Sequence, residues 1–256
     1  MQRRNSIALG IFVLFYISFG AYLTLNQERI VYQPFPQDFD SCAALPDAER
    51  VTFNGTRMYV YKTDKQTVIL YHGNAGSACD RALYANLFSQ AGYGYILVEY
   101  AGYSNDPLPP THNRIKNDVR NVIAYTQTEE ITSITLVGES LGTAVASYHT
   151  SLQAPEKLLL ISAFTDLTDI AGDRFWFYPT SLMVDNAFDN VTALQNYTGA
   201  TLFIHGGNDT LSPIKLATQL YGSLPSDKKF VTISGAGHNN LFAHQETYDA
   251  IAAFLK

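Results

Sequence analysis

The sequence predicts an α/β protein built on a mostly parallel sheet with helices on both of its faces. From Val51 onward, short apolar runs alternate with longer stretches of helical periodicity. Several of these runs are apolar at successive positions and end in Gly, which is typical of strands buried on both faces. Strands that alternate with helices of this size pair in parallel through right-handed crossovers.

The individual elements follow from the same pattern. Asn54-Gly55 is the favoured two-residue turn and predicts a hairpin between the runs that flank it. Further strands are expected at residues 67–73, 95–100, 134–138, 157–163, 201–206 and 230–234. Helices are expected near residues 79–92, at about 113–127, from Leu141 onward and at about 240–255.

One connection is longer than a crossover helix needs, namely the segment between Ala163 and Thr201. An insertion at this place can cover a ligand site at the carboxyl ends of the strands, so we expect a cap at about residues 164–200. Ordinary packing under a long loop is the alternative for any one of its aromatic residues. These residues are Phe164, Phe175, Trp176, Phe177 and Tyr178.

The N-terminal segment has the properties of a membrane anchor. Residues 7–25 carry no charge, and as a helix they reach about 28 Å, close to the thickness of the hydrocarbon core. Arg3 and Arg4 precede the segment, which predicts a cytoplasmic N-terminus and an extracytoplasmic or periplasmic remainder. A cleaved secretory signal and a buried helix are the alternatives. The expected division is a cytoplasmic stub and anchor at residues 1–28 and one α/β domain at residues 29–256.

Charge and cysteine content exclude several classes of function. The chain has 17 Lys and Arg against 23 Asp and Glu, a net charge of -6, so nucleic acid is not an expected partner. Cys42 and Cys79 are too few for a tetrahedral zinc site. An oxidising compartment would permit a disulfide between them, and two buried free thiols are the alternative.

A nucleophile elbow is expected at Gly138-Glu139-Ser140-Leu141-Gly142, which satisfies the pattern G-x-S-x-G. A predicted strand precedes this pentapeptide and a predicted helix follows it, as the sharp turn of an elbow requires. A serine hydroxyl is a poor nucleophile near neutral pH, so the elbow needs a base and an acid that orients the base.

Asp209 and His238 follow later predicted strands, in the chain order Ser, Asp, His that such a site uses. We therefore expect Ser140, Asp209 and His238 to form a catalytic triad. The other histidines fit less well, because they lie in predicted helices, in a Pro-rich loop or before a glycine at a strand end: His149, His244, His112, His72 and His205. A glycan on the sequon at Asn208 would block the site, which favours an unglycosylated, bacterial setting.

Two backbone N–H groups are expected to form an oxyanion hole. The elbow supplies that of Leu141, and the loop at residues 72–76 supplies that of Asn74. A simple glycine-rich turn is the alternative for this loop, which matches no phosphate-binding pattern. The chemistry requires no metal or organic cofactor.

With these residues in place, the sequence resembles the α/β-hydrolase superfamily, in particular its membrane-anchored branch with an N-terminal single-pass segment. The similar segments are YHGNAG, LVEYAGYS, GESLG, HGGNDTLSP and GAGHNN. Relatives in that branch include protein depalmitoylases and a fungal cell-polarity protein. The resemblance implies Ser140 as nucleophile, Asp209 as acid and His238 as base. The chain departs from the family at Glu99-Tyr100-Ala101-Gly102, where relatives have Asp-Tyr-Arg-Gly, and at Asn240, where they have Asp.

The expected function is hydrolysis of an ester or thioester through a covalent acyl-enzyme. An amidase or peptidase with the same triad is one alternative. A membrane-tethered scaffold that has the fold without turnover is another. The expected substrate is a small or acylated molecule, and the aromatic residues of the insertion favour an acylated or lipid-like one.

Overall fold

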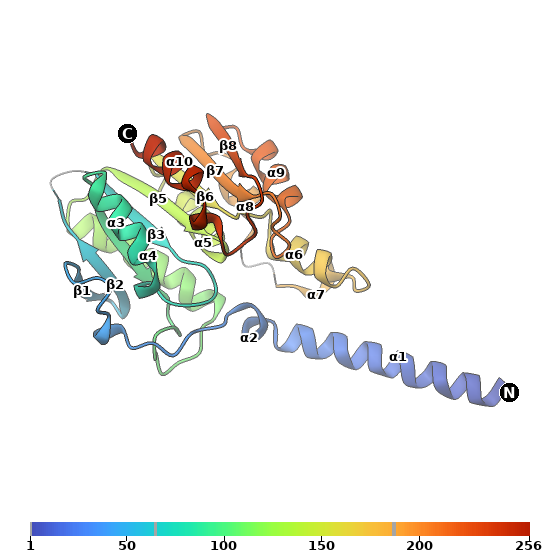
Figure 1. Ribbon diagram of the computed structural model, residues 1–256. Coiled ribbons are helices and arrows are strands. Elements are labelled where there is room, and N and C mark those ends of the chain that lie inside the picture. The colour runs from blue at the N-terminus through green and yellow to red at the C-terminus, as the bar shows by residue number, and fades with distance from the viewer. Residues whose placement is uncertain (1, 64–65, 186–187) are drawn as a thin grey trace.

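The computed structural model describes residues 2–63, 66–185 and 188–256. Within these residues, an 8-stranded sheet has the order β1-β2-β4-β3-β5-β6-β7-β8 (Figure 1). β1 and β2 are antiparallel, β2 is antiparallel to β4, and the strands from β4 to β8 are parallel to their neighbours. The strands are β1 (Glu49–Phe53), β2 (Thr56–Tyr61), β3 (Thr67–Tyr71), β4 (Gly94–Glu99), β5 (Ile134–Glu139), β6 (Lys157–Ile161), β7 (Ala200–Gly206) and β8 (Lys228–Ile233). The predicted hairpin at Asn54-Gly55 and the mostly parallel sheet are therefore confirmed.

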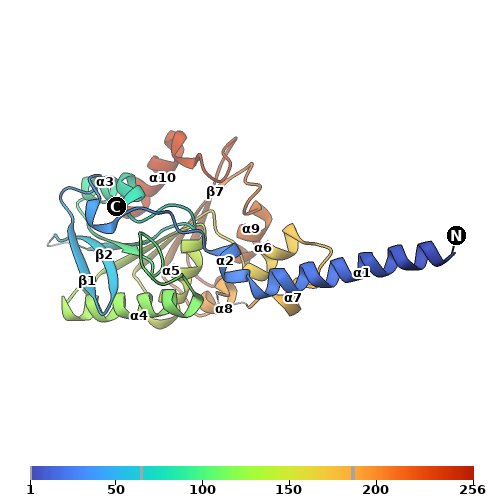
Figure 2. The ribbon, with the colours of Figure 1, turned by 90° about the horizontal axis from the view of Figure 1, so that it is seen from below.

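Helices cover both faces of the sheet (Figure 2). α4, α5, α8 and α9 pack against one face, where Ile69 and Tyr71 of β3 are buried, and α3 and α10 cover the other, where Val68 and Leu70 are buried. Successive residues of β3 thus point into different cores, which explains why the strand is apolar at every position. These helices are α3 (Ala82–Gln90), α4 (His112–Thr128), α5 (Leu141–Leu152), α8 (Asn190–Leu194), α9 (Ile214–Ser223) and α10 (Gln245–Leu255).

The segment expected to form a cap, residues 164–200, follows β6 at the carboxyl edge of the sheet. Short helices occupy its described part, namely α6 (Leu167–Arg174), α7 (Thr180–Met183) and α8. Trp176 is 81% exposed and Leu182 is 85% exposed, whereas Tyr178 is buried. Residues 164–200, which we call the cap after the role expected of them, therefore present exposed apolar side chains at Trp176 and Leu182.

The N-terminal helix α1 (Gln2–Leu25) extends outward from the domain and contacts it at the cap, and the short helix α2 (Gln27–Val31) joins α1 to the domain (Figures 1 and 2). Within the described residues, one helix is long and apolar enough to cross a membrane, at Arg4–Leu25, with a mean hydropathy of 2.0. Most of its apolar side chains are exposed. The expected domain border after residue 28 falls within α2.

The helix boundaries near His244 and His112 differ from the sequence-based prediction. The helix expected at about residues 240–255 is divided into the short helix η3 (Leu241–Ala243) and α10, so that His244 precedes α10 instead of lying inside it. His112, expected in a loop, is the first residue of α4, and the side chain of Thr111 accepts a hydrogen bond at the start of that helix. In both places the observed helix boundary differs from the expected one, and the topology is as expected.

Candidate active site

Ser140 forms the turn between β5 and α5. Its backbone has φ 51° and ψ −118°, a conformation that costs a non-glycine residue free energy. The N–H of Ser140 donates to the carbonyl of Ile161 at 2.8 Å, which ties the turn to the neighbouring strand β6. The sharp turn presents the hydroxyl at the carboxyl edge of the sheet.

The two glycines of the elbow allow the backbone to pack closely. A Cβ at Gly138 would lie 2.5 Å from the carbonyl oxygen of Gly142, and a Cβ at Gly142 would lie 1.9 Å from that of Tyr71. Both distances are below any real contact of a Cβ, so only glycine allows α5 to begin against β3. The G-x-S-x-G pattern is thus a packing requirement at this place.

The structure brings Ser140, His238 and Asp209 together, although they are far apart in the sequence. Nε2 of His238 lies 2.8 Å from Oγ of Ser140, and Nδ1 lies 2.7 Å from Oδ2 of Asp209. An ionised carboxylate only accepts hydrogen bonds, so Nδ1 carries the proton and Nε2 is left to accept from the serine hydroxyl. This arrangement allows His238 to remove the proton from Ser140.

Asp209 is buried and its loop holds it as a carboxylate. Oδ1 accepts from the N–H groups of Leu211 at 2.9 Å and Ser212 at 2.8 Å. Burial alone would raise the pKa of Asp209, but the hydrogen bonds from His238 and Ser212 outweigh it and the pKa is lowered. His205 supports the same loop, because its Nε2 lies 2.8 Å from the carbonyl of Ser212. Burial lowers the pKa of His205, so its imidazole is neutral and donates here.

The residues expected to form the oxyanion hole lie on two different elements. Leu141 is the first residue of α5, so its N–H has no partner within the helix. Asn74 lies in the loop after β3, where its side chain has a role that the sequence did not indicate. Oδ1 accepts from the N–H of Gln33 at 2.7 Å and from the hydroxyl of Tyr103 at 2.9 Å. The side chain of Asn74 thereby fixes the loop that carries its backbone N–H.

An ion pair between Arg81 and Glu139, which no sequence motif indicates, joins this loop to the elbow. The guanidinium donates through Nε and Nη2 to the two carboxylate oxygens, each at 3.0 Å. Nη2 also donates to the carbonyl of Ala75 at 3.2 Å. A two-point contact of this kind fixes orientation as well as distance. Glu139 is the x residue directly before the serine in G-x-S-x-G, a position at which the motif specifies no residue type.

The two departures from the family pattern have clear structural roles. Oε2 of Glu99 accepts from the N–H of Ala78 at 3.1 Å, in the connection that follows β3. Asn240 accepts from the N–H of Gly237 at 2.6 Å and so supports the turn that carries His238. The amide of Asn240 can make this contact as well as a carboxylate could.

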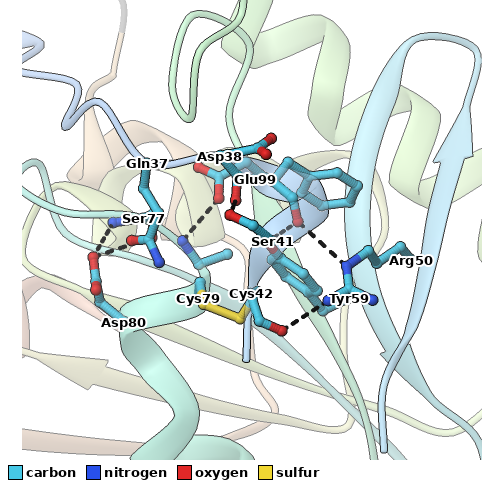
Figure 3. Close-up of a disulfide and its surroundings, with 12 residues drawn as sticks. Gln37, Asp38, Ser41, Cys42, Arg50, Tyr59, Ser77, Cys79, Asp80 and Glu99 are labelled. Carbon is cyan, nitrogen blue, oxygen red and sulfur yellow. Dashed lines mark hydrogen bonds between the residues drawn. A yellow bond between two sulfur atoms is a disulfide. The ribbon is translucent and has the colours of Figure 1, made fainter. Parts of the chain in front are cut away.

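A disulfide joins Cys42 to Cys79, with a Cα–Cα distance of 5.8 Å (Figure 3). It connects the short helix η1 (Phe39–Ser41) to η2 (Cys79–Arg81), which ends in the arginine that contacts Glu139. Of the two alternatives that the sequence left open, the structure has the bridge. The disulfide therefore tethers the segment that follows the candidate oxyanion loop.

A cavity of about 240 Å³ lies beside Ser140 and His238. Its lining is part polar and part apolar, and includes Glu139, Arg81, Tyr84 and Phe242. Within the described part of the chain, no group of three His, Cys, Asp or Glu side chains is placed to hold a metal ion. The cavity has room for a small acyl or alcohol group.

The chain has the α/β-hydrolase fold. An esterase from Exiguobacterium antarcticum superposes with a TM-score of 0.63 over 81% of this chain and 99% of that chain, at 20% identity. A serine hydrolase, CCSP0084, from Cycloclasticus zankles superposes with a TM-score of 0.61 over 81% of this chain and 96% of that chain, at 17% identity. At such identities these structures establish the fold alone. No family model matches the sequence.

Two proteins are also similar to this chain in amino-acid sequence. The uncharacterized protein Rv2307c of Mycobacterium tuberculosis is 26% identical over 249 residues, which cover 91% of this chain and 89% of that protein. Human alpha/beta hydrolase domain-containing protein 17C is 23% identical over 200 residues, which cover 75% of this chain and 59% of that protein. The similarity to both is distant.

Proposed function

We propose that this protein is a serine hydrolase that cleaves a carboxylic ester or thioester through a covalent acyl-enzyme. The observation that carries the proposal is the continuous chain of contacts from Oγ of Ser140 through the imidazole of His238 to the carboxylate of Asp209. The shared fold with esterases and other serine hydrolases supports it.

The proposed reaction has two halves. Oγ of Ser140 attacks the carbonyl carbon while His238 accepts the hydroxyl proton, and the collapsing intermediate expels an alkoxide or thiolate that takes this proton from His238. Water then attacks the acyl-enzyme with the same base and releases the carboxylic acid. Asp209 keeps the proton on Nδ1 and stabilises the imidazolium that forms in each half.

The oxyanion of each tetrahedral intermediate requires hydrogen-bond donors. In this proposal they are the backbone N–H groups of Leu141 and Asn74, and loss of one such donor typically costs about 3 to 4 kcal/mol of transition-state stabilisation. The Arg81–Glu139 ion pair supports their relative position, because it connects the loop after β3 to the elbow.

A serine-directed probe tests the proposal. The purified full-length protein is treated with a fluorophosphonate and assayed with p-nitrophenyl butyrate. We expect Ser140→Ala to lose both labelling and hydrolysis while its circular dichroism is unchanged. Ser151→Ala is the matched control, because this serine lies at the exposed end of the same helix. Activity of Ser140→Ala within tenfold of wild type would contradict the proposal.

Further assays with the same purified protein distinguish the ester or thioester hydrolase from an amidase or peptidase and from a scaffold without turnover. An ester or thioester hydrolase leaves aminoacyl anilides intact, whereas an amidase or peptidase cleaves them. A scaffold without turnover is not labelled by the fluorophosphonate. A series of acyl esters then tests for a lipid-like substrate, and preference for acetate over octanoate would contradict it.

The location proposed for the protein is a membrane, with α1 as an uncleaved anchor, the N-terminus in the cytoplasm and the catalytic domain on the other side. The apolar surface of α1 and the disulfide support this location, because disulfides persist in oxidising compartments. Protease added to intact cells or spheroplasts should digest the domain. A domain that is protected until the membrane is broken would contradict the orientation, and a mature protein lacking α1 would contradict the anchor.

A further inference from the structure

The middle of α1 contacts the cap. The hydroxyl of Tyr16 donates to the carbonyl of Phe177 at 2.7 Å, and the hydroxyl of Tyr178 donates to the carbonyl of Tyr16 at 2.7 Å. The rings of Tyr16 and Tyr178 stack with their centroids 4.4 Å apart. Gly20 permits the approach, because a Cβ there would lie 2.9 Å from Cε1 of Tyr178. Small residues have this role where helices meet in membranes.

The position of this contact along α1 determines the depth of the cap. Tyr16 precedes Leu25, the last residue of α1, by nine positions, which corresponds to about 14 Å along the helix axis. The hydrocarbon core is about 30 Å thick, so Tyr16 of a spanning helix lies near its middle. The carbonyl of Phe177 is hydrogen-bonded to Tyr16 and therefore lies at a similar depth.

The composition of the cap segment at residues 175–184 suits that depth. These ten residues, FWFYPTSLMV, carry no charge, and the charged residues Arg174 and Asp185 flank them. The N–H of Asp185 donates to Oε1 of Gln27 at 2.8 Å, which places the charged end of the segment beside the polar residues that follow α1. The segment thus extends from the membrane surface, near Asp185, to the depth of Tyr16, near Phe177.

The backbone of the segment is also suited to a medium without water. Several of its N–H groups donate to carbonyls within residues 171–180, namely those of Phe175, Tyr178, Thr180, Leu182 and Val184. Proline at position 179 has no N–H to satisfy. Unpaired backbone groups are costly in hydrocarbon, so this pairing lowers the cost of insertion.

We propose that residues 175–184 insert into the hydrocarbon of the bilayer beside α1, with Trp176, Phe177 and Leu182 in contact with lipid chains. The proposal rests on the membrane location of α1 proposed above and is independent of the hydrolytic activity. It explains the exposed apolar side chains of the cap and gives the hydroxyl of Tyr16, in the middle of an apolar helix, a partner inside the membrane.

Trp176 is the one tryptophan of the chain, so its fluorescence reports on the segment directly. The full-length protein is reconstituted into vesicles of phosphatidylcholine and phosphatidylglycerol and separated by flotation. We expect phosphatidylcholine brominated in its acyl chains to quench Trp176, and aqueous acrylamide to have little effect. The control reporter is Trp176→Phe combined with Leu152→Trp, because Leu152 is 50% exposed at the end of α5 that points away from the elbow. This reporter should be quenched by acrylamide and not by the brominated lipid.

A pair of glycine variants tests whether the contact with α1 holds the segment at depth. Gly20→Leu should separate the cap from the helix and lose roughly half or more of the lipid quenching of Trp176, since close packing there requires a small residue. Gly10→Leu is the matched control, because a Cβ at Gly10 has no neighbour within 4 Å, and it should leave the quenching unchanged.

Three results would overturn the proposal. If acrylamide quenches Trp176 as strongly as it quenches the control reporter, the segment lies in water and does not insert. Flotation of the protein would still support the proposal that α1 is a membrane anchor. If neither quencher reaches Trp176, protein covers it, and a second copy of the chain is the occupant to seek by crosslinking. If the protein does not float with the vesicles, both the anchor and the inserted cap are wrong.

Discussion

Among the described residues, His238 with Asp209 and His72 with Glu99 are both histidine–carboxylate pairs at strand ends, and of these two only the first has the geometry proposed for a catalytic base. In the pair of His238 and Asp209, Nδ1 and Oδ2 are 2.7 Å apart, and the second ring nitrogen faces the hydroxyl of Ser140. In the pair of His72 and Glu99, Nε2 and Oε1 are 3.6 Å apart and both side chains are buried. Nδ1 of His72 lies 2.7 Å from the carbonyl of Gly73, so neither nitrogen faces an accessible hydroxyl.

The difference lies in what surrounds each pair. The ring of His72 stacks on Tyr100 with centroids 4.1 Å apart, and Glu99 supports the backbone of Ala78, so this pair holds the loop after β3. The ring of His238 borders the cavity that also contains Ser140. An imidazole beside a carboxylate can therefore be a structural element or a base, and access to a nucleophile distinguishes the two.

Asp209→Asn should produce the largest effect, because it alters the pair that we propose to be catalytic. An amide at this place can donate to Nδ1 and favour the wrong tautomer of His238, and the expected loss in kcat is about 10⁴-fold. The measurement is p-nitrophenyl butyrate hydrolysis together with circular dichroism. A folded variant with a loss of less than tenfold would show that the pair at His238 is as structural as the pair at His72.

Asp118 is a third buried carboxylate and has no imidazole beside it. It accepts from the hydroxyl of Thr56 and from the N–H of Ala101, each at 2.7 Å, and burial raises its pKa from the ordinary value of 3.8 to about 6. A pKa raised by folding stabilises the protein below about pH 4, and this contribution is lost as the pH rises through 6. The difference in pKa corresponds to about 3 kcal/mol.

We therefore expect Asp118→Asn to flatten the dependence of the unfolding free energy on pH between pH 4 and 7, measured by denaturant titration. Asp47→Asn is the matched control, because Asp47 is exposed and water solvates it in both states. An unchanged profile in Asp118→Asn would mean that burial does not govern this carboxylate and would weaken the contrast with Asp209, whose partners lower its pKa.

Glu99→Leu should have the smallest effect of the three. It leaves the N–H of Ala78 without a partner and removes the carboxylate that lies 3.6 Å from Nε2 of His72. The expected loss is about 2 kcal/mol of unfolding free energy, as buried unpaired polar groups cost. Glu99→Gln should lose less, because its amide oxygen still accepts from Ala78. The measurement is thermal unfolding in detergent, with kcat followed in parallel. A loss in kcat as large as that of Asp209→Asn would assign the His72 pair to the chemistry.

The sequence predicted the sheet and the contacts of Ser140, Asp209 and His238 because these follow from local patterns. Each of the three residues follows a strand of the parallel part of the sheet, and parallel strands bring their carboxyl ends to one edge. The disulfide was undecided, because a separation of 37 residues in sequence says nothing about the 5.8 Å between the two Cα atoms.

Roles that depend on distant partners were not predictable. The side chain of Asn74 contacts Gln33 and Tyr103, which lie on segments that no motif connects to it. The contact of Tyr16 with the cap was equally hidden, because the apolar sequence of α1 indicates a span and not which of its faces has a protein partner.

The helix α9 was not predicted at all. It begins directly after Pro213, and Leu216 and Leu220 on its buried face complete one core.

The 1.9 Å that would separate a Cβ at position 142 from the carbonyl of Tyr71 has a consequence for mutational tolerance. In a saturation library, position 142 should accept glycine and reject even alanine, whatever substrate is used for selection. Depletion there would report on the seating of α5 on β3, whereas depletion at position 140 would report on turnover. Sorting the library first for folded protein and then for activity would separate these two constraints within a single motif.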